Sequence, residues 1–159
     1  MFLQRKGVLA EDKLFATLGT SVGKMWIAPV IDDDVHERIP GREILVNDTI
    51  GFIRDLPPSL IAAFRSTLED SIEADILLHV IDAGDPWIWE KIALVEKTLS
   101  QIGAKQERIY VFNKIDRVTP EQSREIQDLF SSLSPICVSA SEKIGIDQLE
   151  QKIHKKLEY

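Results

Sequence analysis

The sequence predicts an α/β protein in which helices cover both faces of a doubly wound, mostly parallel β-sheet. Short apolar segments rich in β-branched residues alternate, in the second half of the chain, with longer segments whose apolar residues recur every three or four positions. The short segments are apolar on both faces, which is typical of strands in a parallel sheet covered on both sides. Each longer segment has one apolar stripe, which is typical of a helix packed on such a sheet. This alternation favours three layers joined by crossover connections.

The elements of this sheet can be placed in order along the chain. Strands are expected at 44–46, 76–81, 109–112 and 135–138, and helices at 60–72, 88–102, 126–133 and 146–157. The third helix has the clearest start signal, with Thr119 as N-cap, Pro120 at the first helical position and Gln122 at the third. His79 lies inside a predicted strand and is interpreted as a hydrogen-bonded core residue rather than a ligand.

The first third of the chain has a different pattern. Residues 24–31 are expected to form an edge strand, because Pro29 has no backbone donor for a second neighbour. A polar connection then ends in a turn at Pro40 and Gly41, and a returning strand is expected at 43–47. These segments predict an edge hairpin over 24–47.

Composition limits the class of protein. The 159 residues suit one domain, 44% are hydrophobic and 28% charged, and the net charge is −7. Such a surface repels phosphate backbones and anionic membranes as a whole. No apolar stretch approaches the roughly 18 residues of a membrane span, and no signal peptide is recognisable, so a cytoplasmic protein is expected. The single cysteine, Cys137, excludes an internal disulfide, and we expect a buried, unreactive thiol with no disulfide-linked partner.

Polar residues follow every predicted strand of the sheet. Ligands of open α/β sheets bind beyond the carboxyl ends of the strands, so these residues are the candidate site. After the strand at 44–46 comes an Asp-x-x-Gly pattern, Asp48 to Gly51. Asp48 could hold Mg²⁺ through water and Gly51 could bring its N–H close to a phosphate, although the pattern taken alone is more typical of an ordinary turn.

The Asn-Lys-x-Asp pattern after the strand at 109–112 has a more specific interpretation. The Asp116 carboxylate can accept two parallel hydrogen bonds from N1–H and the N2 amine of guanine, a donor pair that adenine lacks. Lys114 could lay its alkyl chain along the purine face, and Asn113 could brace neighbouring loops. Ser139 and Ala140, after the next strand, would offer a backbone N–H to guanine O6. The order and spacing of these residues predict a guanine site.

These motifs also resemble a known family. The segment DTIGFIRDLPPSLIAAFRSTLEDSIEADILLHVIDAGDP at 48–86, with NKID and VSAS downstream and VLAEDKLFATL upstream, is similar to the GTPase domain of the HflX family, within the Obg–HflX group of translation-factor-related GTPases. The resemblance runs from about Val8 to Leu157. It implies a P-loop GTPase fold, binding of GTP and GDP with Mg²⁺, hydrolysis of GTP, and association with the large ribosomal subunit.

The resemblance assigns roles to individual residues. Within the family pattern, 8–23 corresponds to the first switch region and 76–157 to the guanine-binding half of a single domain at 1–159. Thr17 matches the switch threonine that reaches Mg²⁺ and the terminal phosphate, and Asp48 is the second metal-site residue. Phe52 stands where many GTPases place a water-orienting glutamine, which implies slow hydrolysis. The nucleotide-binding positions implied in this way are Phe15, Ala16, Thr17, Leu18, Asp48, Thr49, Ile50, Gly51, Asn113, Lys114, Ile115, Asp116, Ser139 and Ala140.

One part of the family pattern is not found in the sequence. A P-loop, Gly-x-x-x-x-Gly-Lys-Ser/Thr, is expected upstream of Thr17, and the only Gly-Lys pair, Gly23-Lys24, follows it. We therefore expect a G domain whose first strand and P-loop are missing, with impaired hydrolysis. Three hypotheses remain open: a GTPase acting on ribosomes, a truncated relative that binds guanine nucleotide weakly, and a non-catalytic interaction module that binds none.

Overall fold

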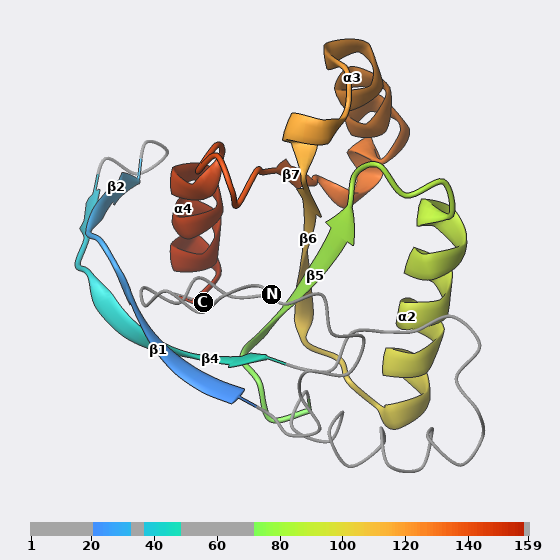
Figure 1. Cartoon of the computed structure of the whole chain (residues 1–159). Coiled ribbons are helices and arrows are strands. Elements are labelled where there is room, and N and C mark those ends of the chain that lie inside the picture. The colour runs from blue at the N-terminus through green and yellow to red at the C-terminus, as the bar shows by residue number, and fades with distance from the viewer. Residues whose placement is uncertain (1–20, 33–36, 49–71, 158–159) are drawn as a thin grey trace.

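The computed structural model describes residues 21–32, 37–48 and 72–157, and every structural statement below refers to them. The elements in order are β1 (Ser21–Ile27), β2 (Val30–Asp32), β3 (Glu37–Ile39), β4 (Arg42–Asp48), β5 (Ile76–Asp82), α2 (Ile88–Ile102), β6 (Glu107–Asn113), α3 (Pro120–Leu129), β7 (Ile136–Cys137) and α4 (Ile146–Lys156) (Figure 1). Two short 3-10 helices lie at Ile115–Arg117 and Ser131–Leu133. The helix predicted at 60–72 lies outside the described residues except for its last position.

A parallel sheet in the order β5-β6-β7 forms the centre of the described structure. Its strands coincide with the segments predicted at 76–81, 109–112 and 135–138, and the parallel pairing is confirmed. Figure 1 shows α4 on one side of this sheet and α2 on the other. None of the helices in the described ranges is long and apolar enough to cross a bilayer.

Two apolar cores fill the space between these layers. On the α4 face, residues of β6 pack with the helix and with the hairpin strand β1; the buried members are Ile27, Ile109, Val111, Ile136, Val138 and Ile153. On the opposite face, α2 and the end of α3 pack on the sheet through Ile81, Ala83, Ile92, Phe112 and Phe130. Odd-numbered residues of β6 therefore face α4, and Phe112 faces α2, as the alternation of side chains along a strand requires. The three-layer α/β prediction is confirmed.

The strand predicted at 44–46 forms, but its placement in the parallel sheet is wrong for the described strands. β4 pairs antiparallel with β1, with Ser21 opposite Asp48 and Ile27 opposite Arg42. Leu45 points outward and is 69% exposed, whereas Ile44 packs against the core. Only one face of β4 is covered, as is usual for an antiparallel pair. Three apolar residues in a row do not reveal that the middle one faces solvent.

The β1–β4 hairpin carries a second, smaller hairpin at its tip, formed by β2 and β3. Pro29 lies between β1 and β2, where its missing N–H breaks no ladder. The predicted turn at Gly41 is tightly packed, because an added Cβ would lie 2.8 Å from the Trp26 ring and 2.9 Å from the Ile27 carbonyl oxygen.

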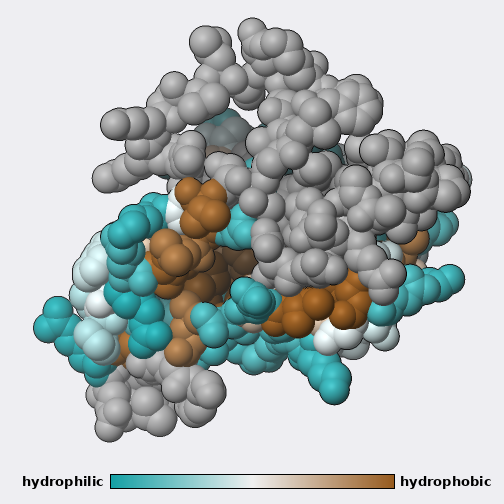
Figure 2. Space-filling model, turned by 90° about the horizontal axis from the view of Figure 1, so that it is seen from below, coloured by the Kyte–Doolittle hydropathy of each residue, from teal (hydrophilic) through white to brown (hydrophobic). Residues whose placement is uncertain are grey.

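Figure 2, which views the molecule from below, shows apolar surface with hydrophilic side chains around it.

Local start and stop signals position the helices beside the sheet. The capping box predicted for α3 is present, because Thr119 Oγ1 accepts from Gln122 N at 3.2 Å and Gln122 Oε1 accepts from Thr119 N at 2.9 Å. Helix α2 ends at Ile102 and is capped by Gly103, whose φ of 82° is a left-handed conformation. The structure thus confirms the helices predicted at 88–102 and 146–157, and places the third at 120–129.

Two buried or partly buried side chains differ from their expected roles. His79 is not fully hydrogen-bonded, because its buried Nδ1 has no partner within the part of the chain that the structure describes. Cys137 is a free, partly exposed thiol, and burial raises its pKa despite a hydrogen bond with Gln127 that acts in the opposite direction. The raised pKa disfavours the reactive thiolate.

Candidate nucleotide site at the carboxyl edge of the sheet

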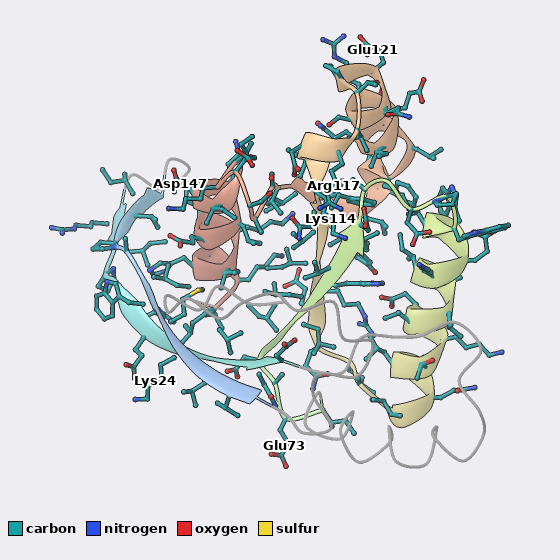
Figure 3. All side chains as sticks on the ribbon, in the orientation of Figure 1. Lys24, Glu73, Lys114, Arg117, Glu121 and Asp147 are labelled. Carbon is teal, nitrogen blue, oxygen red and sulfur yellow. The ribbon has the colours of Figure 1, made fainter. Side chains whose placement is uncertain are left out.

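The parallel strands end together and bring three polar segments to one edge. β5 and β6 are in register to their last residues, with Asp82 opposite Asn113. The segment after β7 joins them, because Ile115 N donates to Val138 O at 3.2 Å. Figure 3 shows Lys114 and Arg117 at this end of the sheet, away from Lys24 and Glu73. The predicted grouping of the Asn-Lys-x-Asp and Ser139-Ala140 segments is therefore present.

Asn113 connects the two segments. The residue is 6% exposed, and its Oδ1 accepts from Lys114 N at 2.8 Å and from Ala140 N at 3.1 Å. Its backbone oxygen also accepts from Ala83 N at 2.8 Å. Through its side chain and its backbone carbonyl group, this one buried residue ties the loops after β5, β6 and β7 together, which is the bracing contact that the sequence suggests for Asn113.

Lys114 is held in an unusual backbone conformation, and its side chain is paired. Its φ of 65° lies in the left-handed region that a lysine rarely adopts. Lys114 Nζ donates to Asp82 Oδ2 at 2.7 Å, and Asp82 Oδ1 accepts from Gly84 N at 3.0 Å. Burial alone would raise the pKa of Asp82, but the hydrogen bonds from Lys114 and Gly84 outweigh it and hold the pKa below its usual value. The aspartate is therefore ionised at neutral pH.

Asp116 has an exposed carboxylate, and one of its two oxygens is held by a hydrogen bond. Its Oδ1 accepts from the hydroxyl group of Ser139, a residue with no exposed surface. Because the single hydroxyl proton of Ser139 is used in this bond, Ser141 is the donor in the 3.1 Å contact between the two serine hydroxyl groups. Glu142 N also donates to Ser139 Oγ at 3.2 Å. The carboxylate is therefore oriented before any ligand binds.

The backbone donors expected for guanine O6 are already in use. Ser139 N donates to Ile144 O at 3.0 Å, and Ala140 N donates to Asn113 Oδ1 at 3.1 Å. Ser139 N lies inside a two-residue β-bridge and is not oriented toward a ligand. Contact between Ala140 N and a base would require this N–H to share or leave its bond to Asn113, a condition that sequence reasoning did not foresee.

The loop after β7 is shaped by a close approach of two backbone segments. Ser139 and Ile144 exchange both backbone hydrogen bonds, at 3.0 Å each, across residues 140–143. Gly145 follows with φ of 72°, and a Cβ at this position would lie 2.3 Å from the Cys137 carbonyl oxygen. Only glycine fits here without displacing β7, so the loop that carries Ser139 is fixed at its base.

The remaining predicted residues cannot be placed in this site. Phe15, Ala16, Thr17, Leu18, Thr49, Ile50 and Gly51 lie outside the described residues. Asp48 is the last residue of β4. No group of three or more potential metal ligands gathers within the described ranges. The predicted Mg²⁺ site of Thr17 and Asp48 therefore stays a prediction.

Sequence reasoning did not assign a role to Asp82, although it directly follows a strand. The sequence signal that could have identified Asp82 was its position at the end of a strand that neighbours the Asn-Lys-x-Asp strand, because neighbouring strand ends lie together in an open sheet. Its pairing with Lys114 depends on the register of β5 and β6, which residue spacing alone does not give. Ser141 and Glu142 were missed for a similar reason, since they act through Ser139.

Two solved structures share this fold. A mutation variant of SsGBP superposes with a TM-score of 0.63 and 28% identity, covering 74% of this chain and 44% of its own. A variant of Era from Aquifex aeolicus, bound to GDP.AlF4-, superposes with a TM-score of 0.53 and 26% identity, covering 72% and 40%. Together with the Asn-Lys-x-Asp edge, these likenesses define the class as an α/β protein with a P-loop GTPase-like fold.

Curated relatives narrow the class to one family. GTPase HflX of Caldanaerobacter subterraneus is 43% identical over 148 residues, covering 92% of this chain and 30% of the relative. GTPase HflX of Escherichia coli is 36% identical over 151 residues, covering 94% and 33%. No protein-family model matches the chain. The chain belongs to the HflX family of GTPases, and it spans about a third of the length of the curated relatives it matches.

Proposed function

We propose that this chain is the guanine-reading part of an HflX-type GTPase and that it binds GTP and GDP at the carboxyl edge of β5, β6 and β7. The observation that carries the proposal is the Asp116 carboxylate, which is exposed and oriented by the buried Ser139 hydroxyl group. A fixed carboxylate can accept N1–H and the N2 amine of guanine together. Adenine has no matching donor pair, so the geometry favours guanine.

Replacing one acceptor oxygen of Asp116 by a donor gives a direct test. Xanthine has a carbonyl group where guanine has the N2 amine, so an asparagine amide can donate to it. We expect Asp116→Asn to weaken GDP binding about 10- to 100-fold, as loss of a hydrogen bond to a charged group predicts, and to improve binding of xanthosine diphosphate. Calorimetric titration of both nucleotides measures the change.

Asp128→Asn is the matched control for this titration. Asp128 is an exposed aspartate at the end of α3, so the same chemical change there should leave both affinities within about twofold. If Asp116→Asn left the preference between guanine and xanthine unchanged, guanine recognition by Asp116 would be wrong.

The proposal also covers the hydrolysis of GTP and the cellular partner. Mg²⁺ bound through Thr17 and Asp48 would supply counter-charge for the phosphates, and Phe52 in place of a glutamine supports slow hydrolysis. By family resemblance the protein acts in the cytoplasm on the large ribosomal subunit. Co-sedimentation with purified large subunits, with GTP, GDP or no nucleotide, tests this partner; equal recovery of the chain without subunits would contradict it.

A second candidate function is a non-catalytic interaction module that binds guanine nucleotide weakly or not at all. The sequence feature that distinguishes it is a P-loop motif, Gly-x-x-x-x-Gly-Lys-Ser/Thr, which these 159 residues do not contain. Titration of GDP and GTP with and without Mg²⁺ separates the candidates. Tight, Mg²⁺-dependent binding supports the GTPase, weak Mg²⁺-independent binding supports a guanine-only site, and no binding supports the interaction module.

A further inference from the structure

We propose that Asp82 is a positioning residue for nucleotide binding, which holds Lys114 so that its alkyl chain can lie along the purine face. The inference rests on the proposed guanine-binding function and extends it to a residue on a different strand. Asp82 would not contact the base itself. It would act through the ammonium group of Lys114, to which it is bonded across the end of the sheet.

Lys114 is fixed at both ends by neighbours. Its backbone N–H donates to Asn113 Oδ1 at 2.8 Å, and its Nζ donates to Asp82 Oδ2 at 2.7 Å. The left-handed backbone, with φ of 65°, sets the direction in which the side chain leaves the loop. A residue in this sparsely populated region persists only when its surroundings hold it there. The Asn113 and Asp82 contacts are two such constraints.

Asp82 is itself fixed and charged. Its second carboxylate oxygen accepts Gly84 N at 3.0 Å, and the residue is the last of β5, paired in register with Asn113 of β6. The ionised state suits its use as an acceptor from an ammonium group, and the lowered pKa of Asp82 is consistent with that state. The Asp82 carboxylate therefore holds the ammonium group of Lys114, and no group that would contact the base is used for this purpose.

Neutralising the ammonium group has a consequence for the ligand. Lys114 and Asp82 side chains are 42% and 39% exposed, so both border solvent where a nucleotide would bind. With Nζ held against Asp82, the methylene groups of Lys114 are left as the surface available to a purine. Without Asp82, the ammonium group would be free to move, and part of the binding free energy would be lost in ordering the side chain again.

A merely structural role for Asp82 is the competing explanation. Through Gly84 the carboxylate also stabilises the turn after β5, and its loss could disturb the fold rather than Lys114. A double-mutant cycle separates the two roles, because an effect transmitted through Lys114 disappears once the ammonium group is gone. Lys114→Met retains the length of the side chain and removes its charge.

The experiment measures affinities of guanosine and GDP for the full chain by calorimetry. We expect Asp82→Asn to weaken the binding of guanosine and of GDP roughly fivefold, which is the upper end of what a partly exposed ion pair contributes. The two affinities should fall together, because the contact that Asp82 supports lies at the base and not at the phosphates. In the Lys114→Met background the same substitution should change affinity by less than about twofold. Asp82→Ser, which also retains an acceptor for Gly84 N, should behave as Asp82→Asn does.

Asp85→Asn is the matched control. Asp85 lies in the same loop and pairs with Lys91, so its substitution should leave both affinities within about twofold. If Asp82→Asn weakened binding equally in both backgrounds, the positioning role would be overturned while the proposed function stood. If the wild-type chain bound neither guanosine nor GDP, the proposed function would fail and the inference with it.

Discussion

At the scale of single residues, the Ser139 hydroxyl group determines how the candidate base-reading carboxylate is presented. Ser139 has no exposed surface, donates its one proton to Asp116, and accepts from Ser141 and Glu142 N. Both of its lone pairs and its proton are thereby used. Because all hydrogen bonds of the Ser139 hydroxyl group are made, its proton points in one direction, and this direction favours one orientation of the Asp116 carboxylate. The affinity of the site should therefore depend on a residue that the nucleotide need not touch.

Ser139→Ala tests this dependence. The substitution leaves the backbone exchange with Ile144 in place but removes the bond to Asp116 Oδ1. Loss of one hydrogen bond to a charged group predicts roughly tenfold weaker GDP binding, measured by calorimetry. Ser141→Ala is the control. This exposed serine contacts Ser139 and not Asp116, so its substitution should weaken GDP binding less than about threefold. Equal effects of the two substitutions would contradict the orienting role of Ser139.

The same residues show what the sequence could reveal at this scale. Asn113, Asp116 and Ser139 were predictable because each follows a strand and belongs to a pattern with a chemical interpretation. Asp82 was not assigned, because its partner Lys114 lies 32 positions away along the chain, directly after the neighbouring strand β6. The use of Ala140 N by Asn113 was equally hidden, since it depends on the angle between two loops.

At the scale of elements, the connection from β7 to α4 controls the geometry of the site. Ser139 and Ile144 close this loop with two backbone bonds, and Gly145 passes directly beneath the Cys137 carbonyl group. The loop can hold Ser139 at the edge of β7 only while Gly145 occupies that position. A change of one methyl group there should propagate to Asp116.

Gly145→Ala is expected to destabilise the fold more than an equally strained glycine elsewhere. Gly145 and Gly103 both have left-handed φ values, 72° and 82°, but only at Gly145 would a Cβ meet a neighbour, 2.3 Å from Cys137 O. Backbone strain alone predicts a cost of about 1–2 kcal/mol for Gly103→Ala, the control. The clash should add about 1–3 kcal/mol for Gly145→Ala, measured by urea unfolding. Equal losses of stability would contradict the close approach.

The hairpin shows where element prediction from sequence fails. The residues of β4 were correctly expected to be extended, and the turn at Gly41 was predicted from Pro40-Gly41. The sequence also predicted that this strand returns along 24–31 in an edge hairpin. The covered face was not predictable, because Ile44, Leu45 and Val46 are equally apolar. In the structure Lys24 and Glu43 form an ion pair at 2.8 Å between β1 and β4. Such cross-strand pairs specify register only once the two strands are known to be neighbours.

At the scale of the whole molecule, the two faces of the sheet have different chemistry. The α4 face of the sheet is packed by aliphatic side chains. The α2 face carries a charged group of residues beside its aromatic core: Tyr110 Oη donates to Glu96 at 2.9 Å, and Arg108 Nε lies 2.9 Å from the other oxygen of Glu96. His79 lies next to Tyr110, with ring centroids 5.6 Å apart. The alternating sequence predicted two covered faces, but not this group, because its members come from α2, β5 and β6.

This charged group makes stability depend on pH in a defined direction. Burial lowers the pKa of His79 to about 4, although Glu96 acts in the opposite direction and Arg108 lowers it further. The unfolded chain binds this proton near pH 6.5, so stability is complete above that pH and falls as the pH drops toward 4. Urea unfolding at pH 7.5 and pH 4.5 should show a loss of about 2–3 kcal/mol from this residue. His79→Leu, which cannot take up the proton, is the comparison and should lose that much less over the same interval. Parallel losses in the wild type and in His79→Leu would show that other groups cause the acid sensitivity and that His79 is protonated as easily in the folded chain as in the unfolded one.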